Sequence, residues 1–211
     1  MTRSLRLLAL AAALLVPQAL NAQACLGAPQ TEHGWVGARL ALTSLEQGLF
    51  GGEAGWRTGG AVIARAQIDR VGFDDKTPSR RRGQIGVLVD GQTWKLPVCF
   101  TASATLTKLG DLTVVTLPIG VAAGYEVPFK ARAKGEAAPK PGTGASLISY
   151  IEPRLAYRRA TLNGFRDVSV PFQLIAGSGI SWRRLFGGVD FEWSPSESRT
   201  WAVGLRAAVG F

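Results

Sequence analysis

The sequence predicts an all-β chain that closes as a transmembrane antiparallel up-and-down β-barrel of about ten strands, with eight as the alternative count. Three observations support this prediction. After the N-terminal segment, apolar and polar residues alternate with a period of two, as they do on the two faces of a strand. Turn signals divide this material into segments of strand length. The final segment keeps the alternation and ends on an aromatic residue, Phe211.

The N-terminal segment has the three parts of a secretory signal peptide. Arg3 and Arg6 precede an apolar stretch over residues 7–16, and Ala22-Gln23-Ala24 has the small-x-small pattern of a cleavage site. The apolar stretch is shorter than the ~20 residues that a helix needs to cross a bilayer. We therefore predict a cleaved signal peptide over residues 1–24 and an exported mature chain.

The chain has two cysteines, Cys25 and Cys99, and both belong to the mature part. Export to an oxidising compartment makes a disulfide between them the default expectation. The alternatives are two unpaired thiols, or lipidation of Cys25 as the first mature residue. Ala22 and Gln23 fit the pattern that precedes a lipidated cysteine poorly, so ordinary cleavage and a Cys25–Cys99 bridge are predicted.

The barrel itself is predicted over residues 34–211, after a short periplasmic lead at 25–33. Turn residues between alternating runs separate the strands. One connection, about 127–144, is long and rich in Pro, Gly and Ala, which favours a flexible periplasmic link. In chain order, the strands are expected near 34–43, 48–57, 60–72, 83–91, 97–108, 112–126, 144–160, 168–182, 185–194 and 199–211.

Each of the clearest strands has one apolar face and one face of small, polar or charged residues. The apolar faces contain Val36, Ala38, Leu40 and Leu42; Val62, Ala64, Ala66 and Ile68; Phe100, Ala102, Ala104 and Leu106; and Leu185, Val189, Phe191 and Trp193. An apolar face suits lipid, and small or charged residues suit a narrow wet lumen. A soluble barrel would carry the reverse arrangement. Aromatic residues near strand ends predict interfacial girdles: Tyr125, Trp182, Trp193 and Trp201.

Charged residues on the second face predict a lumen network of ion pairs, because charges inside a narrow barrel must be paired or hydrated. The network is expected to be structural, and Trp35 and Phe186 are expected to help fill the lumen. Its predicted members are Arg39, Glu53, Arg65, Asp69, Glu152, Arg154, Arg158, Asp190, Glu192 and Arg206.

The chain ends with alternating apolar residues and a terminal aromatic residue: Trp201, Val203, Leu205, Val209 and Phe211. This ending resembles the C-terminal assembly signal of bacterial outer-membrane proteins. The chain as a whole resembles the small outer-membrane β-barrel family, the OmpA/OmpX-like group, whose small members commonly have eight strands. The resemblance implies a location in the cell outer membrane of a Gram-negative-type envelope and assembly by the barrel assembly machinery.

No catalytic, cofactor-binding or metal-binding set is predicted. The single histidine, His33, lies in the lead, and no CxxC or histidine-bearing metal spacing exists. The net charge of +9 does not indicate nucleic-acid binding, because the basic residues lie along strands or in loops and not on one stacking surface. One basic loop, with Lys76, Arg80, Arg81 and Arg82, is a candidate contact for lipopolysaccharide phosphates.

The sequence thus predicts a non-enzymatic outer-membrane barrel with a structural or surface-interaction role and a lumen mostly filled by side chains. The first alternative is a narrow, anion-biased passive channel, with the lumen arginines setting the bias. A lipid-modifying barrel enzyme and a soluble periplasmic ligand-binding barrel are weaker alternatives. The ligand and the oligomeric state stay open.

Overall fold

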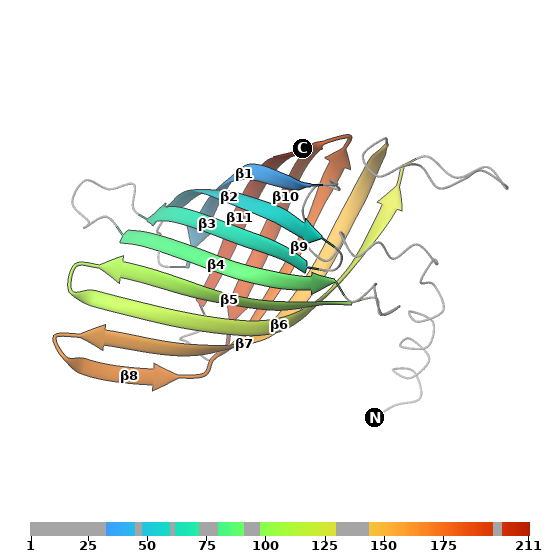
Figure 1. The fold of residues 1–211 in the computed structure, drawn as a ribbon. Helices are drawn as coiled ribbons and strands as arrows, with labels where there is room; N and C mark the ends of the chain where they lie inside the picture. The colour runs from blue at the N-terminus through green and yellow to red at the C-terminus, as the bar shows by residue number, and fades with distance from the viewer. Residues whose placement is uncertain are drawn as a thin grey trace, which may run out of the picture.

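A computed structural model describes residues 33–44, 48–59, 62–71, 80–90, 98–129, 144–195 and 200–211. These residues form strands joined by turns, as Figure 1 shows. The strands are β1 (Gly34–Thr43), β2 (Gly48–Gly59), β3 (Val62–Val71), β4 (Arg80–Asp90), β5 (Val98–Leu109), β6 (Leu112–Pro128), β7 (Ala145–Leu162), β8 (Phe165–Ser169), β9 (Phe172–Trp182), β10 (Leu185–Ser194) and β11 (Thr200–Gly210). The predicted signal peptide, residues 25–32 of the lead and Lys76 lie outside the described residues.

The strands close into one antiparallel barrel. Neighbours in the chain pair with each other, and β1 pairs with β11, so the sheet has no first or last strand. Strands β8 and β9 both pair with β7 and form one wall strand, interrupted at Val170 and Pro171. Proline has no N–H to donate to a ladder, but the Pro171 carbonyl still accepts a bond from Ala156 N at 3.0 Å. The predicted antiparallel barrel with ten wall strands is confirmed.

The turn between β7 and β8 differs from the prediction. A polar link over residues 161–167 was expected, whereas both strands extend to a two-residue turn at Asn163 and Gly164. Both turn residues have positive φ, 48° and 85°. Asn-Gly favours this tight hairpin geometry, so the sequence did carry the signal for a longer hairpin.

The basic loop also ends earlier than predicted, because β4 begins at Arg80 and not at residue 83. In the ladder between β3 and β4, Arg82 lies opposite Asp69, and Arg81 lies opposite Arg70. Charged residues can continue a strand when one face points to solvent or a wet lumen. Arg80, Arg81 and Arg82 are therefore wall residues, and the assignment of these three to a loop was wrong.

The outer wall carries the apolar face. Ile68, Ile85 and Ile119 are 73%, 68% and 68% exposed, although each lies within a paired strand. Most of the large apolar residues that the structure describes lie on this wall, whereas a soluble barrel would carry them inside. The predicted girdle residues Tyr125, Trp182, Trp193 and Trp201 are also exposed on this wall. The faces thus match a barrel surrounded by lipid.

Among the residues that the structure describes, no helix is long and apolar enough to cross a bilayer.

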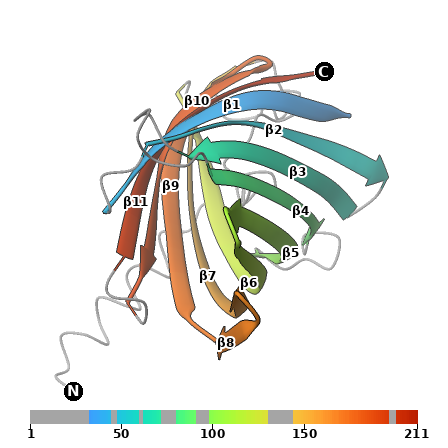
Figure 2. The ribbon, with the colours of Figure 1, turned by 90° about the vertical axis from the view of Figure 1, so that its left-hand side faces the viewer.

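The two ends of the barrel differ. We call the end with Gly34, Phe211 and the Arg183–Arg184 turn the terminal end, and the end with Ser44, Gly110 and Asn163 the far end. Figure 1 shows β5 to β8 extending to the far end at the lower left, and Figure 2 views the barrel from that side.

Candidate functional site

The lumen is closed near the terminal end by a layer of buried apolar side chains. We call this the apolar layer, and it consists of Trp35, Ile63, Leu88, Cys99, Ala122, Ile148, Phe186 and Ala208. Each residue lies near the terminal end of its strand. Cys99 and Ile148 are fully buried. Because a dry apolar layer gives ions no hydration, it is a barrier to their passage.

Glycines make room for the two large rings of this layer. A Cβ at Gly55 would overlap the Trp35 indole, and a Cβ at Gly179 or Gly188 would overlap the Phe186 ring. Gly55 and Gly179 come from strands adjacent to the aromatic residues, and Gly188 lies two residues after Phe186 in the same strand. The glycines therefore let bulky residues fill a narrow barrel.

A layer of charged side chains lies next to the apolar layer, toward the far end. The structure places all ten predicted network residues on the lumen face: Arg39, Glu53, Arg65, Asp69, Glu152, Arg154, Arg158, Asp190, Glu192 and Arg206. Their strands supply them at alternate positions, which keeps the neighbouring residues on the lipid side.

Glu53 lies at the centre of the charged layer. Its side chain has no exposed surface and binds two guanidinium groups. Arg206 donates from Nη2 at 2.7 Å to Oε1 and at 2.9 Å to Oε2, and Arg65 donates from Nη2 to Oε2 at 2.8 Å. One buried carboxylate thus holds together β2, β3 and β11.

Two further ion pairs join other strands around the lumen. Arg39 Nη2 lies 2.6 Å from Asp190 Oδ2, and Arg154 Nη2 lies 2.8 Å from Glu192 Oε1. Arg154 also donates from Nε to Gln173 Oε1 at 2.8 Å. These bonds connect β1 to β10 and β7 to both β9 and β10, so they cross-link strands that lie far apart in the chain.

The other two carboxylates of the network take neutral donors. Gln67 Nε2 donates to Asp69 at 2.7 Å, and the Thr101 hydroxyl donates to Glu152 at 2.7 Å. Reasoning from charge alone could not identify these partners. The alternation of β3 and β5 places Gln67 and Thr101 on the lumen face, and that signal was present in the sequence.

Sequence reasoning missed Arg82 as a lumen residue. Its side chain borders both lumen cavities, beside Arg39 and Arg154. Within the described residues, Arg82 makes no ion pair and no hydrogen bond through its side chain. Period-two counting back from Gln84 would have placed Arg82 on this face.

Two cavities occupy the rest of the lumen. The larger, about 490 Å³, is bordered at its mouth by Ser44, Leu112 and Thr200, which lie beside far-end turns and links. We call this cavity the cup. The smaller, about 80 Å³, lies among the charged residues and shares Arg82 and Arg154 with the cup. The lumen is therefore a cup open at the far end and closed by the charged and apolar layers below it.

Comparison with known proteins shows no family for this chain. No protein-family model and no curated protein matches the sequence. Among solved structures, the chain is similar to neisserial surface protein A, at 12% identity and a TM-score of 0.39, over 84% of this chain and 92% of that one. It is also similar to the N-terminal β-barrel domain of Pseudomonas aeruginosa OprF, at 13% identity and a TM-score of 0.35, over 85% of this chain and 97% of that domain. These likenesses are too distant to carry an argument about function.

The predicted assembly signal lies on the outer wall. Its residues Trp201, Val203, Leu205, Val209 and Phe211 are all exposed there. Phe211 also packs against Trp56, with ring centroids 5.8 Å apart, and its carbonyl accepts bonds from His33 N and Gly34 N at 3.3 Å. The terminal aromatic residue therefore has structural contacts besides any role in recognition.

Several charged side chains of the lumen bind each other as ion pairs. Asp190 and Glu192, which could be imagined as a pair of catalytic carboxylates, each bind an arginine. Within the described residues, no group of three His, Cys, Asp or Glu side chains could hold a metal ion. His33 is exposed beside Phe211, at the terminal end and away from the cup.

Proposed function

We propose that this protein is a non-enzymatic barrel of the cell outer membrane whose lumen is closed and whose role is structural or depends on contacts at the far end. The observation that carries this proposal is the closure of the lumen by the apolar layer. Its buried Trp35 and Phe186 lie below a charged layer in which Glu53, Asp190 and Glu192 are held by arginines. Such a barrel offers no water-filled path between the two sides of the membrane.

The outer-membrane location is supported by the apolar outer wall and by the C-terminal alternation. Closed barrels satisfy every backbone group within lipid, and the outer face of this one carries large apolar residues along its strands. The predicted signal peptide would deliver the chain to the envelope. With the terminal end in the periplasm, the far end and the cup face the outside of the cell.

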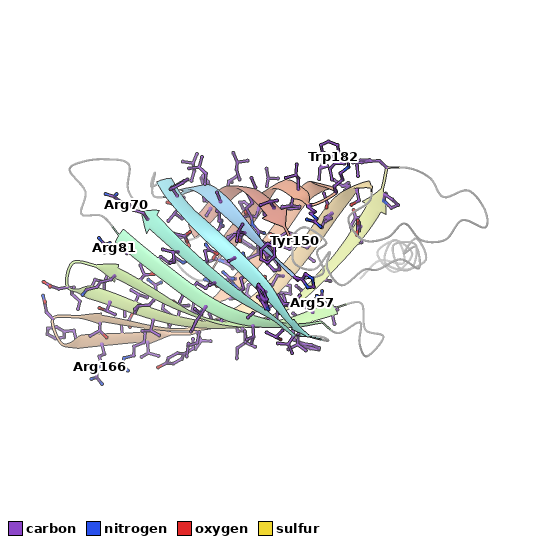
Figure 3. The ribbon with its side chains drawn as sticks, turned by 45° about the horizontal axis from the view of Figure 1, so that its top comes forward. Arg57, Arg70, Arg81, Tyr150, Arg166 and Trp182 are labelled. Atoms are coloured by element: carbon purple, nitrogen blue, oxygen red, sulfur yellow. The ribbon has the colours of Figure 1, made fainter. Side chains whose placement is uncertain are left out.

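Basic residues at the far end support a surface role. Arg70, Arg81 and Arg166 are exposed there, and Figure 3 shows all three at the left, away from Trp182 at the other end. Arg81 also belongs to the segment predicted to contact lipopolysaccharide phosphates, whereas Arg82 faces the lumen. A contact with anionic lipid headgroups would thus use the outward-facing arginines.

Conductance across a planar bilayer tests the closed lumen. The refolded barrel, with insertion verified by its heat-modifiable band on a gel, should give no steady single-channel current. The variant Trp35→Ala/Phe186→Ala, which removes the two largest rings of the apolar layer, should raise the frequency of openings. A steady current through the unmodified protein would overturn the proposal.

The second candidate is a narrow anion-biased channel. It is favoured by the cup wall, which carries four arginines, Arg39, Arg82, Arg154 and Arg158, and one carboxylate, Glu192. The same bilayer experiment decides between the two, because this candidate requires a current that is carried mainly by chloride.

A further inference from the structure

We propose that the cup binds a small soluble molecule that carries a phosphate or sulfate group, with Arg82 as the principal contact for that oxyanion. This site goes beyond the closed-barrel role proposed above and does not depend on whether the lumen conducts. The argument rests on the charge of the cup, on the unsatisfied groups in its wall and on its size.

The wall of the cup has an excess of positive charge. Of its four arginines, Arg154 is neutralised by Glu192 and Arg39 by Asp190. Arg82 lies among them and makes no ion pair in the described part of the chain, although Asp69 lies opposite it in the β3–β4 ladder. Placing an unpaired guanidinium beside two other guanidinium groups costs free energy, and a bound anion would offset that cost.

Buried donors next to Arg82 are also unsatisfied. Arg39 Nε is buried and has no hydrogen-bond partner, although its Nη2 binds Asp190. The Arg39 side chain is only 11% exposed. Asp190 Oδ1, in the carboxylate that Arg39 binds, is also buried without a partner. Buried donors in native proteins are nearly always paired, so the Arg39 Nε–H is a donor that an anion entering the cup would satisfy. Phosphate and sulfate oxygens suit it, because guanidinium groups bind such oxyanions through short charge-assisted bonds.

The rest of the cup wall suits a hydroxylated molecule. Side chains with hydroxyl or amide groups line the cup together with the arginines: Thr43, Gln84, Thr105, Thr107, Thr116 and Ser194. Thr43 Oγ1 is buried without a partner. The volume of about 490 Å³ lies within the ~300–1,000 Å³ range of small-molecule sites. A sugar phosphate fits these features, with the phosphate at the arginines and the sugar hydroxyls at the neutral polar side chains.

Lipid is not the proposed source of the oxyanion. The residues of the cup point into the lumen, whereas the apolar face of the same strands points outward. A headgroup anchored in the bilayer would have to pass over the rim to reach Arg82. A free molecule entering at the far end needs no such path.

Calorimetric titration of the refolded barrel in uncharged detergent tests the site. Three probes are compared: inorganic phosphate, glucose 6-phosphate and glucose. We expect saturable binding of both phosphate compounds that weakens as sodium chloride is added, and no binding of glucose. Tighter binding of glucose 6-phosphate than of phosphate would support the hydroxyl wall, and equal affinities would support the oxyanion contact alone.

Two neighbouring arginines provide the variant and its control. Arg82→Gln should weaken binding by about tenfold or more, since it removes the charge-assisted contact. Arg81→Gln removes the same charge from the outer face of the same strand and should change the affinity by less than about twofold. Both variants must keep the heat-modifiable band. Absence of saturable phosphate binding, or equal effects of the two substitutions, would overturn the proposal. The titration is made in detergent, so its result is independent of orientation and conductance.

Discussion

Arg39 and Arg206 lie directly opposite each other in the register of β1 and β11, so two like charges face each other where the barrel closes. Such a pair opposes strand association unless each charge has its own partner. Arg39 binds Asp190 of β10, and Arg206 binds Glu53 of β2. The carboxylates come from the strands on either side, so the ion pairs and the closing ladder depend on each other.

Replacement of Glu53 should destabilise the barrel strongly. Glu53→Gln leaves Arg65 and Arg206 buried without their common carboxylate, which should lower the free energy of unfolding by about 3–5 kcal/mol. Urea unfolding in lipid vesicles, followed by tryptophan fluorescence, measures the loss. The control is Asp167→Asn, which neutralises an exposed carboxylate in β8 and should leave the midpoint nearly unchanged. Equal midpoints for the two variants would show that the ion pairs contribute nothing.

A methyl group at Gly55 should also be costly. Its Cβ would overlap the Trp35 indole, so Gly55→Ala should destabilise the barrel by about 1–3 kcal/mol. Gly187→Ala is the control, because no heavy atom lies within 4 Å of the added Cβ. In a Trp35→Leu background the Gly55→Ala penalty should shrink. A penalty that stays the same in that background would mean that the indole is not the cause.

A charge on the outer wall tests whether that wall meets lipid. Ile85 is exposed near the middle of β4, and Ile85→Arg should cost about 2–4 kcal/mol of stability in vesicles. Ile85→Leu keeps the face apolar and should cost much less. If the arginine variant is as stable as the leucine variant, this part of the wall does not face hydrocarbon.

The terminal aromatic residue can be tested for a role in assembly separate from its packing. Phe211→Ala should reduce the amount of folded barrel in cells by more than it reduces refolding of purified protein. Trp56→Ala removes the same ring contact and leaves the C-terminal pattern intact, so it serves as the control. Similar losses in cells for both variants would assign the effect to packing.

The bridge between Cys25 and Cys99 stays a prediction, because Cys25 lies outside the described residues. Cys99 is fully buried in the apolar layer. A bridge would therefore fix the segment before β1 at the terminal end of the lumen. Mass analysis of native protein after alkylation without reductant should find neither thiol modified, and labelling of both under denaturing conditions would contradict the bridge.

Most of the wall could be predicted from the sequence because lipid and lumen impose opposite demands on alternate residues. The bounds of β1 and β10 agree with the expected 34–43 and 185–194. The same alternation predicts that the ten charged residues lie on the lumen face. The errors arose where charge was taken as a sign of a loop, as at Arg82, or where the Asn163-Gly164 turn signal was overlooked.

The partners within the lumen could not be predicted in the same way. Alternation gives the face of a residue but not the height at which its side chain meets others across the barrel, which depends on strand tilt and register. Glu53 meets Arg206, from a strand about 150 residues later in the chain, only because β1 lies between β2 and β11. The two cavities depend on the same geometry, and so the cup could not be anticipated.

The pairing of β1 with β11 has a consequence for the order of events during biogenesis. Trp35 and Gly210 are partners in that ladder, so β1 cannot obtain its second neighbour until the strand latest in the sequence has been synthesised. Until then its backbone edge is open, and Glu53 lacks its partner Arg206. An open sheet of this kind is prone to pair with other chains. The open β1 edge must therefore be kept from pairing with other copies of the chain until β11 closes the ladder.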